Sequence, residues 1–217
     1  MTPTPGSTSE ARDPRGEQAT GHWERLYADR GHQDVAWYEE TPTLSTELVL
    51  SAGVPAHVID VGAGASTLPD ALLDAGVAHV TLLDLSMRAL ALTSVRLEER
   101  GNRATTIVAD VLTHAFDEQY DVWHDRAVFH FLVEAGQRAA YASQVRRALR
   151  PGGLLVIGTF APDGPESCSG LPVARYDADG LAAELGEDFM VLDCRRAEHH
   201  TPWDSVQPFT WAVLRRD

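Results

Sequence analysis

Two carboxylates and two glycines stand at the ends of neighbouring apolar segments, where they can bind a small ligand. Asp60, Gly62 and Gly64 belong to the run VIDVGAGAS, which passes directly from a short apolar segment into a predicted helix. Glycines there let the backbone turn tightly and approach a ligand with no Cβ in the way, and the helix start offers free N–H groups to an anion. Asp84 ends the next segment, HVTLLD, where a carboxylate can accept hydrogen bonds from both hydroxyls of a ribose. The arrangement predicts a nucleoside site. Such a site explains the glycine bend and Asp84 together better than a tight turn with an unrelated surface acid does.

Two kinds of nucleoside ligand are compatible with this layout. A dinucleotide site requires the pattern G-x-G-x-x-G, but Thr67 occupies the third glycine position. Asp60 lies inside the strand end, where a carboxylate suits a cationic amino group better than two phosphates. The pattern therefore favours an adenosyl amino acid over a dinucleotide.

The run VIDVGAGAS resembles the first motif of the class I S-adenosylmethionine-dependent methyltransferases, and the resemblance extends over about residues 22–160. It implies S-adenosyl-L-methionine as the cofactor, with Asp60, Gly62 and Gly64 along its methionine and ribose portions and Asp84 on the ribose hydroxyls. The segment DVWHDRAVFHFL resembles the family's motif at the methyl-transfer centre, and LRPGG resembles the turn before the fifth strand. The other cofactor contacts that it implies are Leu85 on the adenine face, Asp110 on the adenine amine, Val111 donating its N–H to the ring, and His124.

Methyl transfer is an in-line displacement at a carbon already activated by a sulfonium, so the cofactor supplies the difficult chemistry. The protein mainly holds the acceptor about 3–3.5 Å from the methyl carbon. A general base is needed only where the acceptor must lose a proton. No catalytic triad is therefore required.

Several side chains that can hold an acceptor or move a proton are expected at the same edge of the sheet. They lie at or just beyond the end of the fourth strand, in the loop after the fifth strand or in the connection before the last strand, and the candidates are His124, Asp125, His130, Cys168 and His199. Ordinary loop packing is the alternative for each, and His130 also fits a packed histidine at a helix start. Their spacing has no metal-ligand signature, and no metal is predicted.

Aromatic residues are dense ahead of the first motif, at Trp23, Tyr27, Trp37 and Tyr38. In this fold such a segment commonly covers the cofactor as a lid; the alternative is an extra helix packed on the sheet. The segments HWERLY and VAWYEE also resemble the start of lysine-methylating enzymes with the same fold. The further acceptor-side motifs of those enzymes are not found.

Alternating strands and helices must position these residues. The predicted fold is α/β, a single doubly wound, mostly parallel seven-stranded sheet with helices on both faces. Strands are predicted at 57–62, 79–84, 105–110, 120–125, 152–160, 188–196 and 206–214, and helices at 22–31, 43–52, 67–75, 86–100, 132–149 and 177–186. Ser86 is expected to cap a helix, as is Thr67 with Asp70 in a capping box. The predicted organisation is a flexible leader (1–19), a helical lid (20–56), the cofactor-binding core (57–160) and a C-terminal part of the same domain with acceptor-side loops (161–217).

Composition restricts the partners. The chain of 217 residues has a net charge of −14, which repels phosphate backbones and disfavours a nucleic-acid substrate. No apolar run approaches the length of a membrane span, and no signal peptide is recognised. Cys168 and Cys194 form no CxxC pair, so reduced thiols in a cytoplasmic protein are expected.

The sequence thus predicts a cytoplasmic methyltransferase that transfers a methyl group to a small-molecule thiol, hydroxyl or amine. The alternatives are a protein-lysine methyltransferase of the same fold, an NAD(P)-dependent oxidoreductase and a non-catalytic sensor of an adenosyl ligand. The oxidoreductase would need a third glycine and usually a separate substrate domain. The acceptor atom and the oligomeric state stay open.

Overall fold

A mostly parallel sheet forms the centre of the computed structural model, which describes residues 14–31 and 33–217. Within those residues seven strands make one sheet in the order β3-β2-β1-β4-β5-β9-β8, and a two-stranded hairpin stands apart from it. The first five strands in this order pair in parallel, whereas β9 pairs antiparallel with both of its neighbours, β5 and β8. Their bounds are β1 His57–Val61, β2 His79–Asp84, β3 Ala104–Val108, β4 Tyr120–Arg126, β5 Leu149–Phe160, β8 Phe189–His200 and β9 Val206–Arg216. The predicted fold class is confirmed.

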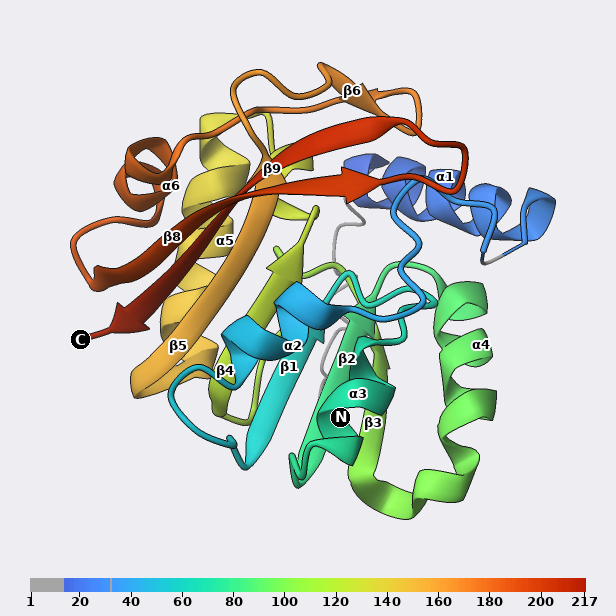
Figure 1. Ribbon diagram of the computed structural model, residues 1–217, viewed down its shortest axis with the longest axis horizontal. Coiled ribbons are helices and arrows are strands. Elements are labelled where there is room, and N and C mark those ends of the chain that lie inside the picture. Colours follow the sequence, from blue (N-terminus) through green and yellow to red (C-terminus); the bar gives the residue numbers. More distant parts are fainter. Residues whose placement is uncertain (1–13, 32) are drawn as a thin grey trace, which may run out of the picture.

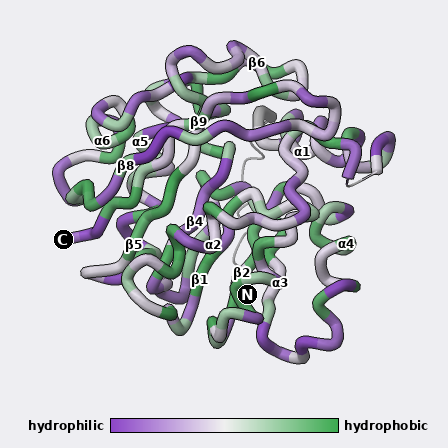
Figure 2. Tube along the Cα trace, in the orientation of Figure 1, coloured by the Kyte–Doolittle hydropathy of each residue, from purple (hydrophilic) through white to green (hydrophobic). Residues whose placement is uncertain are grey.

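Helices cover both faces of the sheet (Figure 1). One face packs against α2 (Thr43–Val49), α3 (Leu68–Asp74) and α4 (Met87–Leu97), whose leucines join apolar residues of β1, β2 and β5 in one buried cluster. The other face packs against α5 (Ala135–Ala148) and α6 (Ala178–Leu185) in a second cluster. Because both faces are buried, the strands need nearly continuous apolar runs. Figure 2 shows these as green segments along the central strands.

Alternation along each strand decides which face a side chain reaches. In β1, Val58 belongs to the cluster with α2 and α3, whereas Ile59 and Val61 belong to the cluster with α5. In β4, Val122 and Trp123 divide between the two faces in the same way. Adjacent residues of one strand therefore contribute to different sites.

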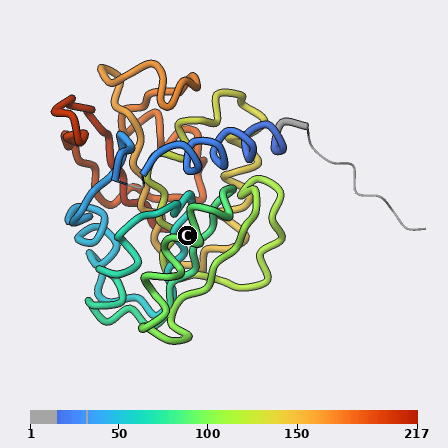
Figure 3. The backbone as a smooth tube through the Cα atoms, turned by 90° about the vertical axis from the view of Figure 1, so that its right-hand side faces the viewer, coloured from blue at the N-terminus to red at the C-terminus, as the bar shows by residue number. Residues whose placement is uncertain are grey.

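The order of the strands reverses beside β1, which lies between β2 and β4. The carboxyl ends of these three strands meet at one edge of the sheet, where ligands bind in open α/β sheets. The helix α1 (Pro14–Asp29) crosses the molecule at this edge, near the N-terminal end of α4 (Figures 1 and 3). Glu24 ties the two helices together, since its Oε1 accepts hydrogen bonds from Ser86 Oγ at 2.9 Å and Arg88 N at 3.1 Å.

Local differences from the predicted elements have identifiable causes. Helix α1 begins at Pro14, inside the predicted flexible leader, and residues 1–13 of that leader lie outside the described residues. Ser86 caps α4 as predicted, with Oγ accepting from Ala89 N, and α4 ends at Leu97, followed by the 3₁₀ segment η1 (Glu98–Arg103). The predicted capping box at Thr67 is wrong, because Thr67 Oγ1 donates to Glu39 O instead.

The C-terminal third differs in two further ways. The hairpin of β6 (Ser167–Cys168) and β7 (Leu171–Pro172) was not predicted, and β8 continues to His200, beyond the predicted end of that strand. Helices α5 and α6 and strand β9 lie within three residues of their predicted bounds. None of the helices in the described ranges combines the length and the apolar character that a membrane crossing requires.

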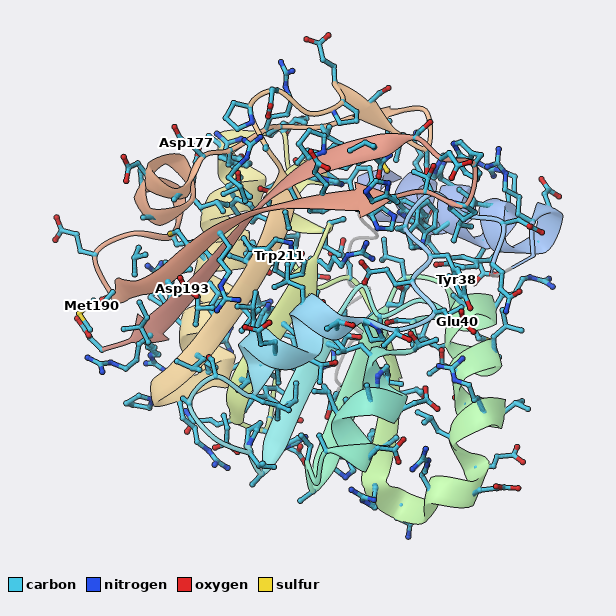
Figure 4. The ribbon with its side chains drawn as sticks, in the orientation of Figure 1. Tyr38, Glu40, Asp177, Met190, Asp193 and Trp211 are labelled. Carbon is cyan, nitrogen blue, oxygen red and sulfur yellow. The ribbon has the colours of Figure 1, made fainter. Side chains whose placement is uncertain are left out.

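Strand β9 packs closely on β5 through a glycine and an indole. Gly158 lies opposite Trp211 in the β5–β9 pair, and a Cβ on Gly158 would lie 2.8 Å from the Trp211 ring. Figure 4 shows Trp211 over the middle of the sheet, whereas Met190 lies at the outer end of β8. This close approach allows the indole to cover the β5 backbone beside the functional edge.

Candidate active site

A cavity of about 300 Å³ opens at the carboxyl edge of the sheet. Its β1–β3 side is lined by the bend after β1 and by the ends of β2 and β3, with Gly62, Asp84, Leu85, Asp110 and Val111. Its β4–β9 side is lined by residues at or after the ends of β4 and β5, by the β6–β7 hairpin and by β9. Among these residues are Arg126, Phe131, Phe160, Cys168 and Phe209. Five residues predicted for the cofactor therefore line one wall.

The bend after β1 requires glycine at two positions. Gly62 has φ +66° and Gly64 has φ +51°, both in the left-handed region. A Cβ on Gly62 would lie 2.1 Å from a methyl of Val128, and one on Gly64 would lie 2.5 Å from the Tyr27 hydroxyl. The bend leaves room for a ligand only because neither residue carries a side chain.

Asp84 ties this bend to the end of β2. Its Oδ2 accepts a hydrogen bond from Gly64 N at 2.9 Å and its Oδ1 accepts one from Ser86 N at 2.7 Å. Burial raises the pKa of Asp84 to about 6, although these two N–H groups act in the opposite direction. Each carboxylate oxygen retains a lone pair that can accept a further donor from the cavity.

Asp60 and His124 form a buried pair on the α2 face of the sheet. The parallel register places them side by side, and His124 Nδ1 lies 2.7 Å from Asp60 Oδ1. Because a carboxylate can only accept, Nδ1 carries the proton, and Nε2 lies 3.0 Å from Ser45 Oγ. Asp60 Oδ2 has no hydrogen-bond partner among the described residues. The pair lines a smaller cavity of about 50 Å³, which shares Gly62 with the larger one.

Asp125 does not reach either cavity. It follows His124 in β4 and so points to the opposite face, where its carboxylate accepts hydrogen bonds from Val128 N at 2.9 Å, Phe129 N at 3.1 Å and the Tyr141 hydroxyl. Burial raises the pKa of Asp125 to about 6. In this position it stabilises the turn after β4, which disfavours the interpretation of Asp125 as an acceptor-side acid or base.

His130 is a packed side chain in the 3₁₀ segment η2 (Phe129–Phe131). Its ring lies 4.5 Å from that of Phe131 and 4.7 Å from that of Phe160, and it is fully buried. Burial lowers the pKa of His130 to about 3, so the ring is neutral. His130 is not part of the lining of the cavity, which favours the packed histidine over a catalytic base.

His199 and Arg126 hold the segment before α2 against the sheet. His199 was expected in a connection but lies in β8, where Nε2 donates to Ala36 O at 2.6 Å. Its Nδ1 then accepts from Arg126 at 3.1 Å. Arg126 also donates to Trp37 O at 2.7 Å and pairs with Glu39 at 3.1 Å. His199 thus has a positioning role outside the large cavity.

Arg126 is a charged lining residue that the sequence did not single out as part of the site. It ends β4 and lines both cavities, and its guanidinium lies 5.6 Å from the centre of the Phe209 ring. Its position directly after the predicted strand 120–125, at the edge where ligands bind, was the available signal. A guanidinium there stays cationic even though burial lowers its pKa.

Comparison with known proteins finds a matching family model over part of the chain. Residues 58–153 match the protein family described as "Methyltransferase domain". The match covers less than half of the chain. Together with the fold, it agrees with the predicted class I S-adenosylmethionine-dependent methyltransferase. No protein with a curated function matches the sequence.

Solved structures of similar fold include several methyltransferases. The protein of a study titled "Conversion of a Disulfide Bond into a Thioacetal Group during Echinomycin Biosynthesis" is 22% identical, with a TM-score of 0.76 over 91% of this chain and 93% of that one. The 1,6-didemethyltoxoflavin-N1-methyltransferase of Burkholderia thailandensis is 20% identical, with a TM-score of 0.76 over 97% and 94%. The N-methyltransferase NodS of Bradyrhizobium japonicum is 18% identical, with a TM-score of 0.71 over 89% and 97%.

The methyltransferase domain is covered by aromatic side chains from the N-terminal segment. Trp23 and Tyr27 of α1 line the large cavity together with Trp37. Trp37 Nε1 donates to the Tyr27 hydroxyl at 3.3 Å, and the Trp23 ring packs edge-on against Trp37. These contacts place α1 over the cavity.

Cys168 contributes the thiol of the β6–β7 hairpin to the β4–β9 side. Burial raises the pKa of this thiol, so it is protonated near neutral pH. Among the described residues, no three His, Cys, Asp or Glu side chains are grouped to hold a metal ion.

Proposed function

We propose that this chain transfers a methyl group from S-adenosylmethionine to a small molecule bound on the β4–β9 side of the large cavity. The observation that carries this proposal is that one cavity joins the glycine bend and Asp84 to an apolar compartment beyond Arg126. Cofactor and acceptor can thus lie in one enclosed volume, as an in-line displacement requires.

The residues of the β1–β3 side, together with Asp60 of the adjoining small cavity, fit this cofactor. Asp60 Oδ2 is a buried carboxylate oxygen without a partner in the described part of the chain, which suits the cationic amino group of the methionine portion. Gly62 and Gly64 leave the space that a side chain would fill. Asp84 accepts both ribose hydroxyls through its remaining lone pairs. Asp110 and Val111, on the same wall, take the adenine edge, and Leu85 packs on its face.

The protein's part in the reaction is to bind, orient and exclude water. S-adenosylmethionine, when bound, supplies a methyl group activated by its positively charged sulfur. Residues 20–56 act as the lid, since Trp23, Tyr27 and Trp37 close the cavity from above. His124 keeps Asp60 in place through Nδ1, which holds the carboxylate toward the small cavity.

A small acceptor agrees best with the shape of the site. The β4–β9 side is bounded by α1, the segment before α2 and the β6–β7 hairpin, through Trp23, Trp37, Cys168 and Leu171. A structural relative, the Burkholderia thailandensis enzyme, holds 1,6-didemethyltoxoflavin and S-adenosylhomocysteine together. Cys168 and Cys194 are both free thiols, which agrees with a reducing compartment such as the cytoplasm.

Formation of S-adenosylhomocysteine tests the proposal. The purified chain is incubated with S-adenosylmethionine and separate panels of small thiols, phenols and amines, and with cell-extract protein. Turnover with one of the small-molecule panels supports the proposal. Methylation of protein alone would establish the protein-lysine alternative. Calorimetric binding of NADH in place of S-adenosylmethionine would overturn the cofactor assignment.

A further inference from the structure

Aromatic side chains form the walls of the β4–β9 side. Phe131, Phe160 and Phe209 come from the segments after β4, at the end of β5 and in β9, and Trp23 and Trp37 close the same space from the lid. The Trp23 ring lies 5.3 Å from Phe131 and 5.8 Å from Trp37, both edge-on. Such walls bind a flat apolar ring through burial and edge or face contacts.

Arg126 carries the charge on this side. Among the described residues of the β4–β9 side, the other polar side chains in the lining are neutral: Gln137, Gln207 and the Cys168 thiol. Arg126 has five N–H groups, and three contacts, to Trp37 O, Glu39 and His199, hold its orientation. The guanidinium is therefore fixed and cationic at the boundary of the two cavities.

The side chains of the types that act as general bases are engaged in hydrogen bonds or protonated. His124 donates to Asp60, and His199 donates to Ala36 O and accepts from Arg126. Burial keeps the Cys168 thiol protonated. An acceptor in this compartment must therefore reach its reactive form without a proton acceptor from the lining described above.

On the basis of the function proposed above, we propose that the acceptor is an aromatic thiol or acidic phenol that binds as its anion. The ring lies among Trp23, Phe131 and Phe209, and the anionic sulfur or oxygen faces Arg126. A guanidinium beside the acceptor favours its ionised form, and the proton leaves to solvent on binding. A lone pair of the anion then forms the bond to the methyl carbon. The bond from that carbon to the sulfonium sulfur breaks with its electrons on sulfur, which gives a methyl thioether or ether and neutral S-adenosylhomocysteine.

Chromophoric probes test the inference without turnover. 4-Nitrothiophenol and 4-nitrophenol absorb visible light as anions, so their apparent pKa can be measured on the protein saturated with S-adenosylhomocysteine. We expect the pKa of a bound probe to fall by about one unit. At a pH equal to the pKa of the free probe, the ionised fraction then rises from one half to about nine tenths. The two probes distinguish a thiol acceptor from a phenol.

Variants of Arg126 separate charge from packing. Arg126→Lys keeps a cation and should retain most of the shift, whereas Arg126→Gln should lose it. Since Arg126→Gln leaves Glu39 without its cation, the double variant Arg126→Gln/Glu39→Gln serves if the single one is unstable. An unchanged or raised probe pKa on the wild-type protein overturns the inference, as does an equal shift in the Gln variants. Calorimetry of S-adenosylhomocysteine is measured in parallel: failure to bind it removes the proposed function and the inference together, whereas normal binding without a pKa shift removes the inference alone.

Discussion

Asp84 offers the sharpest test of the cofactor site, through the substitution Asp84→Asn. The side chain keeps its shape but loses its charge and one of its two acceptor oxygens. In the wild-type protein both oxygens already accept backbone N–H groups, from Gly64 at 2.9 Å and Ser86 at 2.7 Å. If the carboxylate also accepts two ribose hydroxyls, the substitution removes at least one charge-assisted hydrogen bond, worth about 1.5–3 kcal/mol. The dissociation constant for S-adenosylhomocysteine should then rise at least tenfold, and up to roughly a hundredfold.

The raised pKa of Asp84 gives this prediction a pH dependence. Burial raises the pKa from 3.8 to about 6, so the folded protein binds a proton that the unfolded chain has released between those values. The stability contributed by Asp84 is therefore full below 3.8 and lost as the pH rises through about 6, by about 3 kcal/mol. Ligand hydroxyls that bind the ionised carboxylate offset this penalty. Wild-type affinity should therefore weaken as the pH falls below about 6, and that dependence should be absent from Asp84→Asn.

Isothermal titration with S-adenosylhomocysteine between pH 5 and 8 measures both effects. Asp74→Asn is the matched control, because the same chemical change is made on an exposed carboxylate of α3 that pairs with Arg100. Thermal denaturation at each pH verifies that the variants are folded. Equal affinity of Asp84→Asn and wild type at pH 7, or the same pH profile in both, would remove Asp84 from the ribose site.

Three further substitutions test the packing that positions the site. Gly158→Ala places a Cβ 2.8 Å from the Trp211 ring. The overpacking should lower the free energy of unfolding by about 1–3 kcal/mol and so lower the melting temperature. An unchanged melting temperature would contradict this packing. Tyr141→Phe removes the hydroxyl that donates to Asp125. Urea unfolding should show a loss of about 1–3 kcal/mol in the free energy of unfolding, while the affinity for S-adenosylhomocysteine stays within about twofold. A large loss of affinity would instead place Asp125 in the site. His124→Ala leaves the buried Asp60 carboxylate without its donor, which should lower stability by about 3 kcal/mol and weaken ligand binding. His124→Gln keeps a donor and should restore part of the stability and part of the affinity. Equal behaviour of the two variants would exclude the hydrogen bond as the cause.

Much of the fold could be predicted because the parallel core is encoded locally. Strands β1, β2 and β4 end at or just before a glycine or a charged residue, and the helices between the strands have their own caps or apolar stripes. The start of α1 was missed because residues 14–21, PRGEQATG, have almost no apolar periodicity. The helix there is supported by contacts with α4, such as the bond from Ser86 to Glu24. The β6–β7 hairpin was missed because two-residue strands have no period to detect.

The candidate site was predictable to the extent that neighbouring strands determine it. Asp60, Gly62 and Asp84 follow from two strand ends and one bend, and the structure brings all three to adjoining cavities. Strand alternation alone separates His124 from Asp125, since consecutive residues of β4 point to opposite faces. The two residues were grouped as neighbours at the end of the predicted strand 120–125 without being assigned to opposite faces, whereas β4 continues to Arg126 and the alternation holds through both.

The β4–β9 side was not predictable by the same reasoning, because no continuous segment encodes it. The burial of Arg126 depends on Glu39 and His199, which lie far from it in the chain and from each other. A charged residue at a strand end is ordinarily solvated, and only the simultaneous presence of both partners allows a guanidinium to lie beneath aromatic rings. The β1–β3 side, in contrast, is formed by consecutive strand–helix units that can be retained whole. We therefore expect substitutions at Glu39, Phe209 or Cys168 to alter which acceptor is bound without altering the cofactor wall. Acceptor specificity can then vary independently of cofactor binding in this fold, because different parts of the chain form the two sides.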